Sequence, residues 1–352
     1  MSALGSAPIA SSPLPGVSYV MPVLNEATHV RAAVESLLSQ DYAGPMEVTL
    51  ALGPSTDGTN EIVAQLQSED SRVHVVDNPA AATPVGMNLA ITASVHPIVI
   101  RVDAHSVLPN DYARIAVETL LRTGADNVGG IMDAQGTTSF EKAVARAYGT
   151  KVGLGGSPFH VGGEEGPVDT VYLGVFNRES LNRVGMFNEE IRRGQDWELN
   201  RRFREAGGLV WFTPALKVVY RPRTTMRQLV NQMYSTGLWR GELTRRFPSA
   251  SSLRYFVPPL MVVATLVGVL AGLIGIAQVL YGFPAPALLG WVVPGVYVIF
   301  VLASTMVYGR GLGARGPANF ALVLPCIHFA WGLGFIMSYT RLTPNIAAQN
   351  GR

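Results

Sequence analysis

The sequence predicts an α/β domain with a mostly parallel sheet, followed by C-terminal transmembrane α-helices. Two observations carry this prediction. Short β-branched or apolar runs alternate with amphipathic stretches between residues 17 and 134, which is typical of βαβ units. The charge is also divided unevenly, because all 25 acidic residues precede Tyr255. A charged part joined to an uncharged, apolar part indicates a soluble domain attached to a membrane.

The N-terminal end and the overall charge limit the classes of function. Residues 1–16, MSALGSAPIASSPLPG, are small, polar and broken by proline. They lack the charged start and the continuous apolar core of a signal peptide, so we expect a disordered tail before a cytosolic domain. A net charge of +2 does not favour nucleic acid as a partner. The single cysteine, Cys326, excludes an intrachain disulfide and is compatible with a reducing compartment.

The α/β part is expected to span residues 17–220, and its elements follow in a regular order. The expected strands are residues 17–23, 46–52, 73–77, 97–102, 127–134, 168–176 and 208–213, and the expected helices are residues 28–39, 59–67, 110–123 and 194–207. In such sheets ligands bind beyond the carboxyl ends of the strands. Residues directly after the strands are therefore the first candidates for chemistry.

A glycine-rich segment, KVGLGGSPFHVGGEEG, occupies residues 151–166 inside this part. It has no hydrophobic periodicity, and an ordinary loop is one interpretation. A long glycine-rich loop within an enzyme domain is often functional. The sharper hypothesis is therefore a mobile lid over a substrate.

The chain closes with apolar stretches that are each near the ~20 residues needed to cross a bilayer. These uncharged stretches are residues 256–280, 285–307 and 320–339. We expect three transmembrane helices within residues 256–340, an interfacial amphipathic segment at 221–255 and a tail at 341–352. A hairpin pair with one buried or re-entrant segment is the alternative, because Pro294 and Pro325 interrupt two of the runs.

Arginines beside the apolar stretches set the expected orientation, since basic residues favour the cytosolic side of a membrane. They are Arg240, Arg245, Arg246 and Arg254 before the first stretch, Arg310 and Arg315 before the third, and Arg341 and Arg352 after it. The N-terminal domain is therefore expected in the cytosol and the uncharged first connection, YGFPAP, outside. Three spans place the tail outside, whereas a re-entrant third segment keeps it inside, which Arg341 favours mildly.

Asp103 and His105, in RVDAHS, come directly after an apolar strand. At a strand's carboxyl end both side chains are placed to hold a divalent cation against a diphosphate. Carboxylate and imidazole together suit Mn²⁺ better than Mg²⁺, which prefers oxygen alone. A turn aspartate with a surface histidine is the plainer interpretation of so short a motif.

Two further segments carry candidate side chains. Asp196, in RRGQDWELNRRF, is expected in the first turn of a helix, where a carboxylate either stabilises the helix dipole or acts as a general base. The segment from Tyr220 to Gly241 combines cationic, amide and aromatic side chains just before the first apolar stretch. These are Arg221, Arg223, Gln232, Trp239 and Arg240. They fit an interfacial helix, and also a diphosphate site with a tryptophan platform for a sugar or base.

With these motifs in this order, the sequence resembles the family-2 glycosyltransferases of GT-A fold, a Rossmann-like mixed sheet, and among them the ExoA-type succinoglycan glucosyltransferases. The resemblance covers residues 17–247. The opening VSYVMPVLNEATHVRAAVESLLSQDY, the run STDGT at 55–59, and an NP…N segment formed by Asn78, Pro79 and Asn88 are similar to family segments. RVDAHS is similar to the family's metal motif.

The resemblance implies an inverting, metal-dependent hexosyltransferase that takes a nucleotide sugar. Asp196 falls on the family's catalytic base, and the run from Gln232 to Trp239 and Arg240 resembles its acceptor-side signature. The residues that the resemblance implies for the nucleotide sugar are Pro22, Asn25, Glu26, Asp57, Asn88 and Asp103. We expect a UDP-sugar donor, a lipid-linked acceptor and single-sugar addition at the cytosolic face of the inner membrane.

Two departures from the family pattern stand out. Leu52 and Gly53 occupy the segment where the family commonly has an aspartate that helps to bind the nucleotide. Trp239 also precedes Arg240, at a longer spacing from Gln232 than the Q-x-x-R-W run of processive synthases. Two alternatives therefore stay open: a polyprenyl-phosphate sugar synthase, whose acceptor needs no general base, and a non-catalytic nucleotide-binding membrane protein.

His328 is an ionisable residue within the third apolar stretch. Such residues are costly in a bilayer and are often functional. It is expected either to bond a neighbouring helix as a neutral side chain or to contact the phosphate of a carrier lipid.

Overall fold

The computed structural model describes residues 13–343, and its central element is an eight-stranded mixed sheet. Its strands are β1 (Val17–Val23), β2 (Met46–Leu52), β3 (Val73–Asp77), β4 (Ile98–Arg101), β5 (Asn127–Ala134), β6 (Gly166–Pro167), β7 (Tyr172–Asn177) and β8 (Val210–Tyr220). Their order is β3-β2-β1-β4-β7-β5-β8-β6. Strands β1 to β4 pair in parallel, whereas β7 runs antiparallel between β4 and β5.

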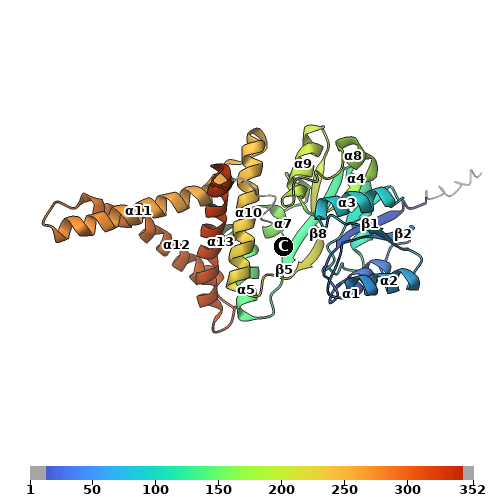
Figure 1. Cartoon of the computed structure of the whole chain (residues 1–352), viewed down its shortest axis with the longest axis horizontal. Coiled ribbons are helices and arrows are strands. Elements are labelled where there is room, and N and C mark those ends of the chain that lie inside the picture. Colours follow the sequence, from blue (N-terminus) through green and yellow to red (C-terminus); the bar gives the residue numbers. More distant parts are fainter. Residues whose placement is uncertain (1–12, 344–352) are drawn as a thin grey trace, which may run out of the picture.

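Helices cover both faces of this sheet, as expected for a domain built from βαβ units. One face is covered by α1 (Val30–Leu38), α2 (Thr59–Glu69) and α4 (Tyr112–Thr123), and the other by α3 (Thr83–Ala93), α8 (Arg178–Val184) and α9 (Gln195–Glu205). The two hydrophobic cores are continuous with the buried strand residues. They hold the strand ends rigidly, which fixes the loops that follow them (Figure 1).

The glycine-rich segment contains two short helices, α6 (Lys151–Leu154) and α7 (Pro158–Val161), where the sequence shows no periodicity. It follows α5 (Ser139–Tyr148), whose first turn is closed by a capping box between Thr138 and Glu141. The predicted mobility of this segment as a lid remains a prediction.

After the sheet, α10 (Met226–Arg246) packs along α13 (Gly316–Tyr339) through glycines. A Cβ atom at Gly237 would lie 2.0 Å from the carbonyl oxygen of Trp331, and one at Gly334 would lie 2.2 Å from that of Tyr234. The two backbones touch, so a larger side chain at either glycine forces the helices apart. The segment 221–255, which the sequence predicts to be interfacial, is therefore mainly the long helix α10. This helix lies against α5 and α13.

Three helices are long and apolar enough to cross a membrane, judged by length and composition. They are α11 (Val257–Leu280), α12 (Val292–Tyr308) and α13, preceded or joined by the short 3₁₀ turns η1 (Pro248–Ala250), η2 (Leu253–Phe256) and η3 (Pro286–Trp291). Figure 1 shows α11 and α12 projecting from the body of the protein as a hairpin, whereas α13 runs beside α10. The N-terminal residues 1–12 and the tail from residue 344 lie outside the described part.

Candidate active site

Asp103 and Asp196, which the sequence predicts as metal ligand and base, meet at one buried arginine. Arg101 is the last residue of β4 and is 7% exposed. Its Nη2 atom donates to Asp103 Oδ1 at 3.1 Å, and its Nη1 atom donates to Asp196 Oδ1. Asp196 lies in the first turn of α9, which begins after Gly194 in a left-handed conformation with φ of 77°. The carboxyl end of β4 and the amino end of α9 thus form one site.

Arg101 was not singled out from the sequence, although it is part of RVDAHS. Burial alone would lower the pKa of Arg101, but the carboxylates of Asp196 and Asp103 hold that pKa well above its ordinary value. The guanidinium is therefore permanently charged. It neutralises two carboxylates that would otherwise repel each other in a half-buried site.

His105 and Glu26 form the opposite side of the site. His105 Nδ1 lies 3.6 Å from Glu26 Oε1, and hydrogen bonding to Glu26 raises the pKa of His105. The backbone N–H of Glu26 donates to Thr59 Oγ1 at 2.8 Å, which fixes the loop after β1 against the start of α2. His105 is exposed, with its ring at the surface of the site.

Asn25 and Asp57 connect two loops. Asn25 adopts a left-handed conformation with φ of 54°, and its Oδ1 atom accepts a hydrogen bond from Thr56 N at 2.8 Å. Asp57 accepts from the backbone N–H groups of Ala27 and Thr59, each at 3.2 Å. Hydrogen bonding from Thr59 lowers the pKa of Asp57, so this carboxylate is committed to the loop. Both residues join the loops that follow β1 and β2.

Pro22 and Asn88 lie further from the ion pairs. Pro22 lies in β1 and is covered by α3. A Cβ atom added at Gly86 of α3 would lie 3.1 Å from the Cβ atom of Pro22. The Asn88 side chain accepts from Phe187 N at 3.0 Å and donates to Phe187 O at 2.9 Å and to Glu189 at 3.0 Å. It therefore holds the loop that leads into α9, which makes it a positioning residue for Asp196 in this structure.

Three of the predicted acceptor-side residues lie in α10 and in the segment that follows β8. Gln232 Nε2 donates to Tyr220 Oη at 2.8 Å, and Arg221 donates to the carbonyl oxygen of Gln135 at 3.2 Å. Arg223 is exposed, and its positive charge acts to lower the pKa of both His105 and Arg193. Burial and the charge of Arg223 lower the pKa of Arg193, a cation that the sequence interpretation missed in the RRGQDWEL run.

The structure corrects the expectation that Trp239 is an open platform for a sugar or base. Trp239 is 3% exposed and packs in a cluster with Ile191, Trp197 and Leu243. The reason is that this face of α10 packs on Ile191 and on Trp197 of α9, on the side of the helix away from the glycines that meet α13. Arg240 lies between aromatic rings instead, with its guanidinium carbon 4.9 Å from the Trp197 ring centroid and 4.4 Å from that of Tyr255.

Comparison with known proteins adds independent evidence. The family model described as Glycosyl transferase family 2 matches residues 18–185. The chain is 33% identical over 322 residues to the succinoglycan biosynthesis protein ExoA of Rhizobium meliloti, covering 90% of this chain and 92% of that protein. The chain belongs to the family-2 glycosyltransferases.

Two further likenesses agree with this assignment. This family-2 glycosyltransferase is 29% identical over 122 residues to the glycosyltransferase AglE of Haloferax volcanii, covering 34% of this chain and 40% of that one. A mannosyltransferase from Pyrobaculum calidifontis, solved in complex with GDP-Man and Mn²⁺, shares the fold. Its TM-score is 0.57 at 17% identity, with 97% of this chain and 91% of that chain covered. The mixed sheet is thus that of a GT-A-like glycosyltransferase.

Candidate metal ligands are few in the described part of this glycosyltransferase. Among residues 13–343 no group of three or more His, Cys, Asp or Glu side chains is arranged to hold a metal ion. Asp103 and His105 offer one carboxylate and one imidazole, a donor set that suits Mn²⁺. Two protein ligands fit a site in which the diphosphate of a bound donor completes the coordination sphere.

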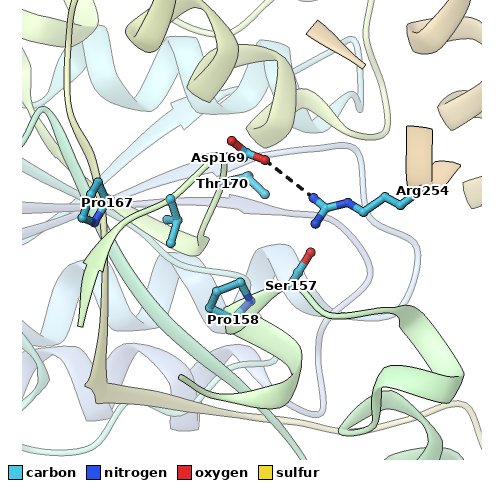
Figure 2. A pocket seen from close by; sticks show the side chains of 7 residues that line it. Ser157, Pro158, Pro167, Asp169, Thr170 and Arg254 are labelled. Carbon is cyan, nitrogen blue, oxygen red and sulfur yellow. Dashed lines mark ion pairs between the residues drawn. The ribbon is translucent and has the colours of Figure 1, made fainter. Parts of the chain in front are cut away.

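A cavity of about 250 Å³ lies beside α9, between α7, the segment after β6 and the residues before α11 (Figure 2). Its polar lining includes Ser157, Thr170, Asp169 and Arg254. Asp169 lies 3.7 Å from Arg254 and 3.7 Å from Arg204 of α9. The cavity therefore joins the glycine-rich segment and the helix of Asp196 to the start of the apolar hairpin.

His328 has protein partners on both ring nitrogens. Its Nδ1 atom lies 3.0 Å from Tyr297 Oη of α12, and its Nε2 atom lies 2.7 Å from the carbonyl oxygen of Val152 in α6. The structure therefore agrees with the bonded histidine rather than a lipid contact, and this side chain ties the glycine-rich segment to the apolar helices.

Proposed function

We propose that this enzyme transfers a single sugar from a UDP-sugar to a hydroxyl of a lipid-linked saccharide at the cytosolic membrane face, with inversion. The product serves synthesis of a cell-surface polysaccharide or glycolipid. The observation that carries the proposal is the joining of Asp103 and Asp196 through Arg101 at the carboxyl end of the parallel strands. In this proposal Asp103 is the ligand on the diphosphate side and Asp196 is the base, with the cation of Arg101 between them.

On the donor side, Asp103 and His105 would hold a divalent metal, with Mn²⁺ preferred over Mg²⁺. A bound metal supplies charge stabilisation to the leaving diphosphate. Arg223 and the half-buried Arg193 add positive charge next to His105. The bonded loops of Asn25 and Asp57 form the edge beyond β1 and β2, where the nucleotide of the donor fits.

Asp196 acts as the general base in this proposal. The acceptor hydroxyl loses its proton to the Asp196 carboxylate while its oxygen forms the new bond to the sugar C1, and the bond from C1 to the diphosphate breaks. Attack from the face opposite the leaving group inverts C1. Arg101 holds Oδ1 of Asp196, so the second carboxylate oxygen remains to take the proton, and the side chain is 33% exposed.

The acceptor reaches the site from the membrane. Gln232 is fixed by Tyr220 and Tyr148, and the cavity at Arg254 lies beside the residues that precede the first apolar helix. A lipid-linked saccharide is anchored at the depth where the hairpin of α11 and α12 enters the bilayer. The apolar helices thus keep the enzyme where such an acceptor presents its head group.

The test is a screen of UDP- and GDP-sugars with the purified full-length protein in lipid nanodiscs. We expect Mn²⁺-dependent release of UDP that increases when a lipid-linked saccharide is added, and a product longer by one sugar. Transfer to polyprenyl phosphate alone would identify a polyprenyl-phosphate sugar synthase instead. Binding of a nucleotide sugar with neither hydrolysis nor transfer would contradict catalysis altogether.

A further inference from the structure

Polar helices of the catalytic domain flank α13 along its whole length, although its composition is that of a membrane span. On one side lies α10, which runs parallel to α13. Gly237 touches Trp331, and a Cβ at Gly241 would lie 2.5 Å from the carbonyl oxygen of Phe335. The end of α13 is therefore level with the end of α10, and Figure 1 shows the two helices side by side.

The first half of α13 is held by hydrogen bonds to α5 and α6. Asn319 Nδ2 donates to Ser139 Oγ at 3.2 Å, and His328 is bonded to the carbonyl oxygen of Val152 at 2.7 Å. Contacts with the catalytic domain thus occur near the start, the middle and the end of the helix. Whatever depth α13 occupies, α10 and the neighbouring loops occupy nearly the same depth.

The side chains of α10 exclude a position across the bilayer. Arg227 and Gln228 are exposed at its start, and Arg246 is exposed at its end. Arg240 and the buried Glu242 lie between them, with Glu242 bonded to Arg245 and Arg246. Each charged residue at the centre of a bilayer costs about 2.5–3.5 kcal/mol, and no lipid-facing polar backbone of the adjoining loops is tolerated there.

We propose that α13 does not cross the membrane but lies along its cytosolic surface, and that only α11 and α12 cross. The helix then forms the floor of the catalytic domain, with its inner face on α10 and α5 and its outer face on the acyl chains. The partner of this outer face is the cytosolic leaflet of the bilayer. The proposal does not depend on the sugar donor or the acceptor.

The exposed residues of α13 match such a surface. Leu322 is 62% exposed and Leu333 is 46% exposed. They are eleven residues apart, which is close to three full turns, so both lie on one face of the helix. Two exposed apolar side chains on one side of the helix, with the catalytic domain on the other, fit a helix that meets lipid at the membrane surface.

The hairpin differs from α13 in the respects that matter for crossing. The most apolar windows of the first and second candidate spans are 28% and 11% buried, against 39% for α13. The hairpin points away from the catalytic domain in Figure 1, and it meets α13 through the start of α11, at Pro258 and Val262, and through α12 from Tyr297 to Tyr308. Its tip carries no charge, as expected of a translocated loop. The tail after Tyr339 then faces the cytosol, in agreement with Arg341.

Cysteine accessibility tests the sidedness in the full-length chain with Cys326→Ala. Single cysteines replace Leu342 after α13, Tyr281 at the hairpin tip and Ser68 on the catalytic domain, and a membrane-impermeant maleimide is added to right-side-out or inside-out vesicles. We expect Leu342→Cys to react from the same side as Ser68→Cys, and Tyr281→Cys from the opposite side. Reaction of Leu342→Cys from the side of Tyr281→Cys, or of Tyr281→Cys from the side of Ser68→Cys, overturns the proposal.

Immersion depth tests the orientation of the helix directly. Probes on cysteines at Leu322 and Leu333 are quenched by lipids brominated at known depths, and the matched pair Val263 and Ile274 is measured in α11. Eleven residues rise about 16 Å along a helix. We expect Val263 and Ile274 to differ in depth by most of this rise, and Leu322 and Leu333 to lie within a few ångströms. Equal differences in the two pairs would refute a surface helix.

Discussion

Arg101 is the side chain on which the site depends most, and its replacement by methionine has a calculable effect. Methionine keeps a similar length but removes the charge and both ion pairs. Asp103 and Asp196 then remain as two neighbouring carboxylates without their common cation. We expect the variant to be both less stable and strongly impaired in transfer.

The burial of the three side chains sets the magnitude. Removing one partner of a buried ion pair typically costs about 3–5 kcal/mol. The Arg101 side chain is 8% exposed, but those of Asp103 and Asp196 are 22% and 33% exposed, so water relieves part of their repulsion. The low end, about 3 kcal/mol, therefore applies. For a domain of this size that corresponds to a loss of about 6–12 °C in Tm.

The assay combines thermal unfolding with transfer kinetics on the full-length protein in nanodiscs. We expect transfer to fall by about 10²–10³-fold, since a preorganised charged donor at the site is lost. Arg101→Lys keeps the charge but replaces the two-pronged guanidinium by one ammonium group, so an intermediate loss is expected. Arg31→Met is the matched control, because Arg31 forms only exposed pairs with Glu35 and Glu69, worth about 0–1 kcal/mol.

The reasoning on Arg101 fails if Arg101→Met unfolds within about 2 °C of the parent and transfers sugar within tenfold of it. It also fails if Arg31→Met has an equal effect on stability, because the loss then reflects any arginine and not this bridge.

Three further predictions concern other parts of the chain. Burial acts to raise the pKa of Asp126, but hydrogen bonds and the charge of Arg183 outweigh it and lower that pKa. The ionised Asp126 therefore stabilises the fold above the unfolded pKa of about 3.9, and this stabilisation is lost as the pH falls through the folded pKa. Asp126→Asn should therefore flatten the acid limb of a curve of Tm against pH. Arg254→Ala should raise the KM for a lipid-linked acceptor severalfold and leave that for the donor unchanged; a shift in donor KM alone would contradict this. His328→Ala should lower Tm by releasing Val152, with about 1 kcal/mol for each bond lost, and unchanged unfolding would refute the tether.

Much of the sheet follows from local sequence. The runs at 17–23, 46–52, 73–77 and 127–134 form strands with the predicted bounds. Their β-branched and apolar side chains form short continuous runs, and this local pattern is sufficient to identify them. Helix α3 was not predicted, because its apolar residues show hardly any amphipathic period. Strand β8 extends to Tyr220, past the expected end, because it pairs with both halves of β5 across a register shift.

The site was predictable only where the chemistry follows a strand or opens a helix. Asp103 and Asp196 carry such local signals, whereas the role of Arg101 depends on a partner 95 residues away. The burial of Trp239 likewise depends on Ile191 and Trp197, which meet α10 only in the folded chain. Contacts of this range leave no trace in local periodicity. The lid, the nucleotide contacts and the span number stay predictions.

The central claim is that Asp196 removes the proton from the acceptor hydroxyl, and single-turnover transfer by Asp196→Asn tests it most directly. Asparagine keeps an oxygen that can accept from Arg101, so donor binding should survive. Loss of a positioned general base costs about 10²–10⁴-fold. We predict a fall of that size in the rate of transfer to a hydroxyl acceptor, with the dissociation constant of the nucleotide sugar changed less than threefold. Transfer at near the parent rate, with donor binding intact, would contradict the assignment.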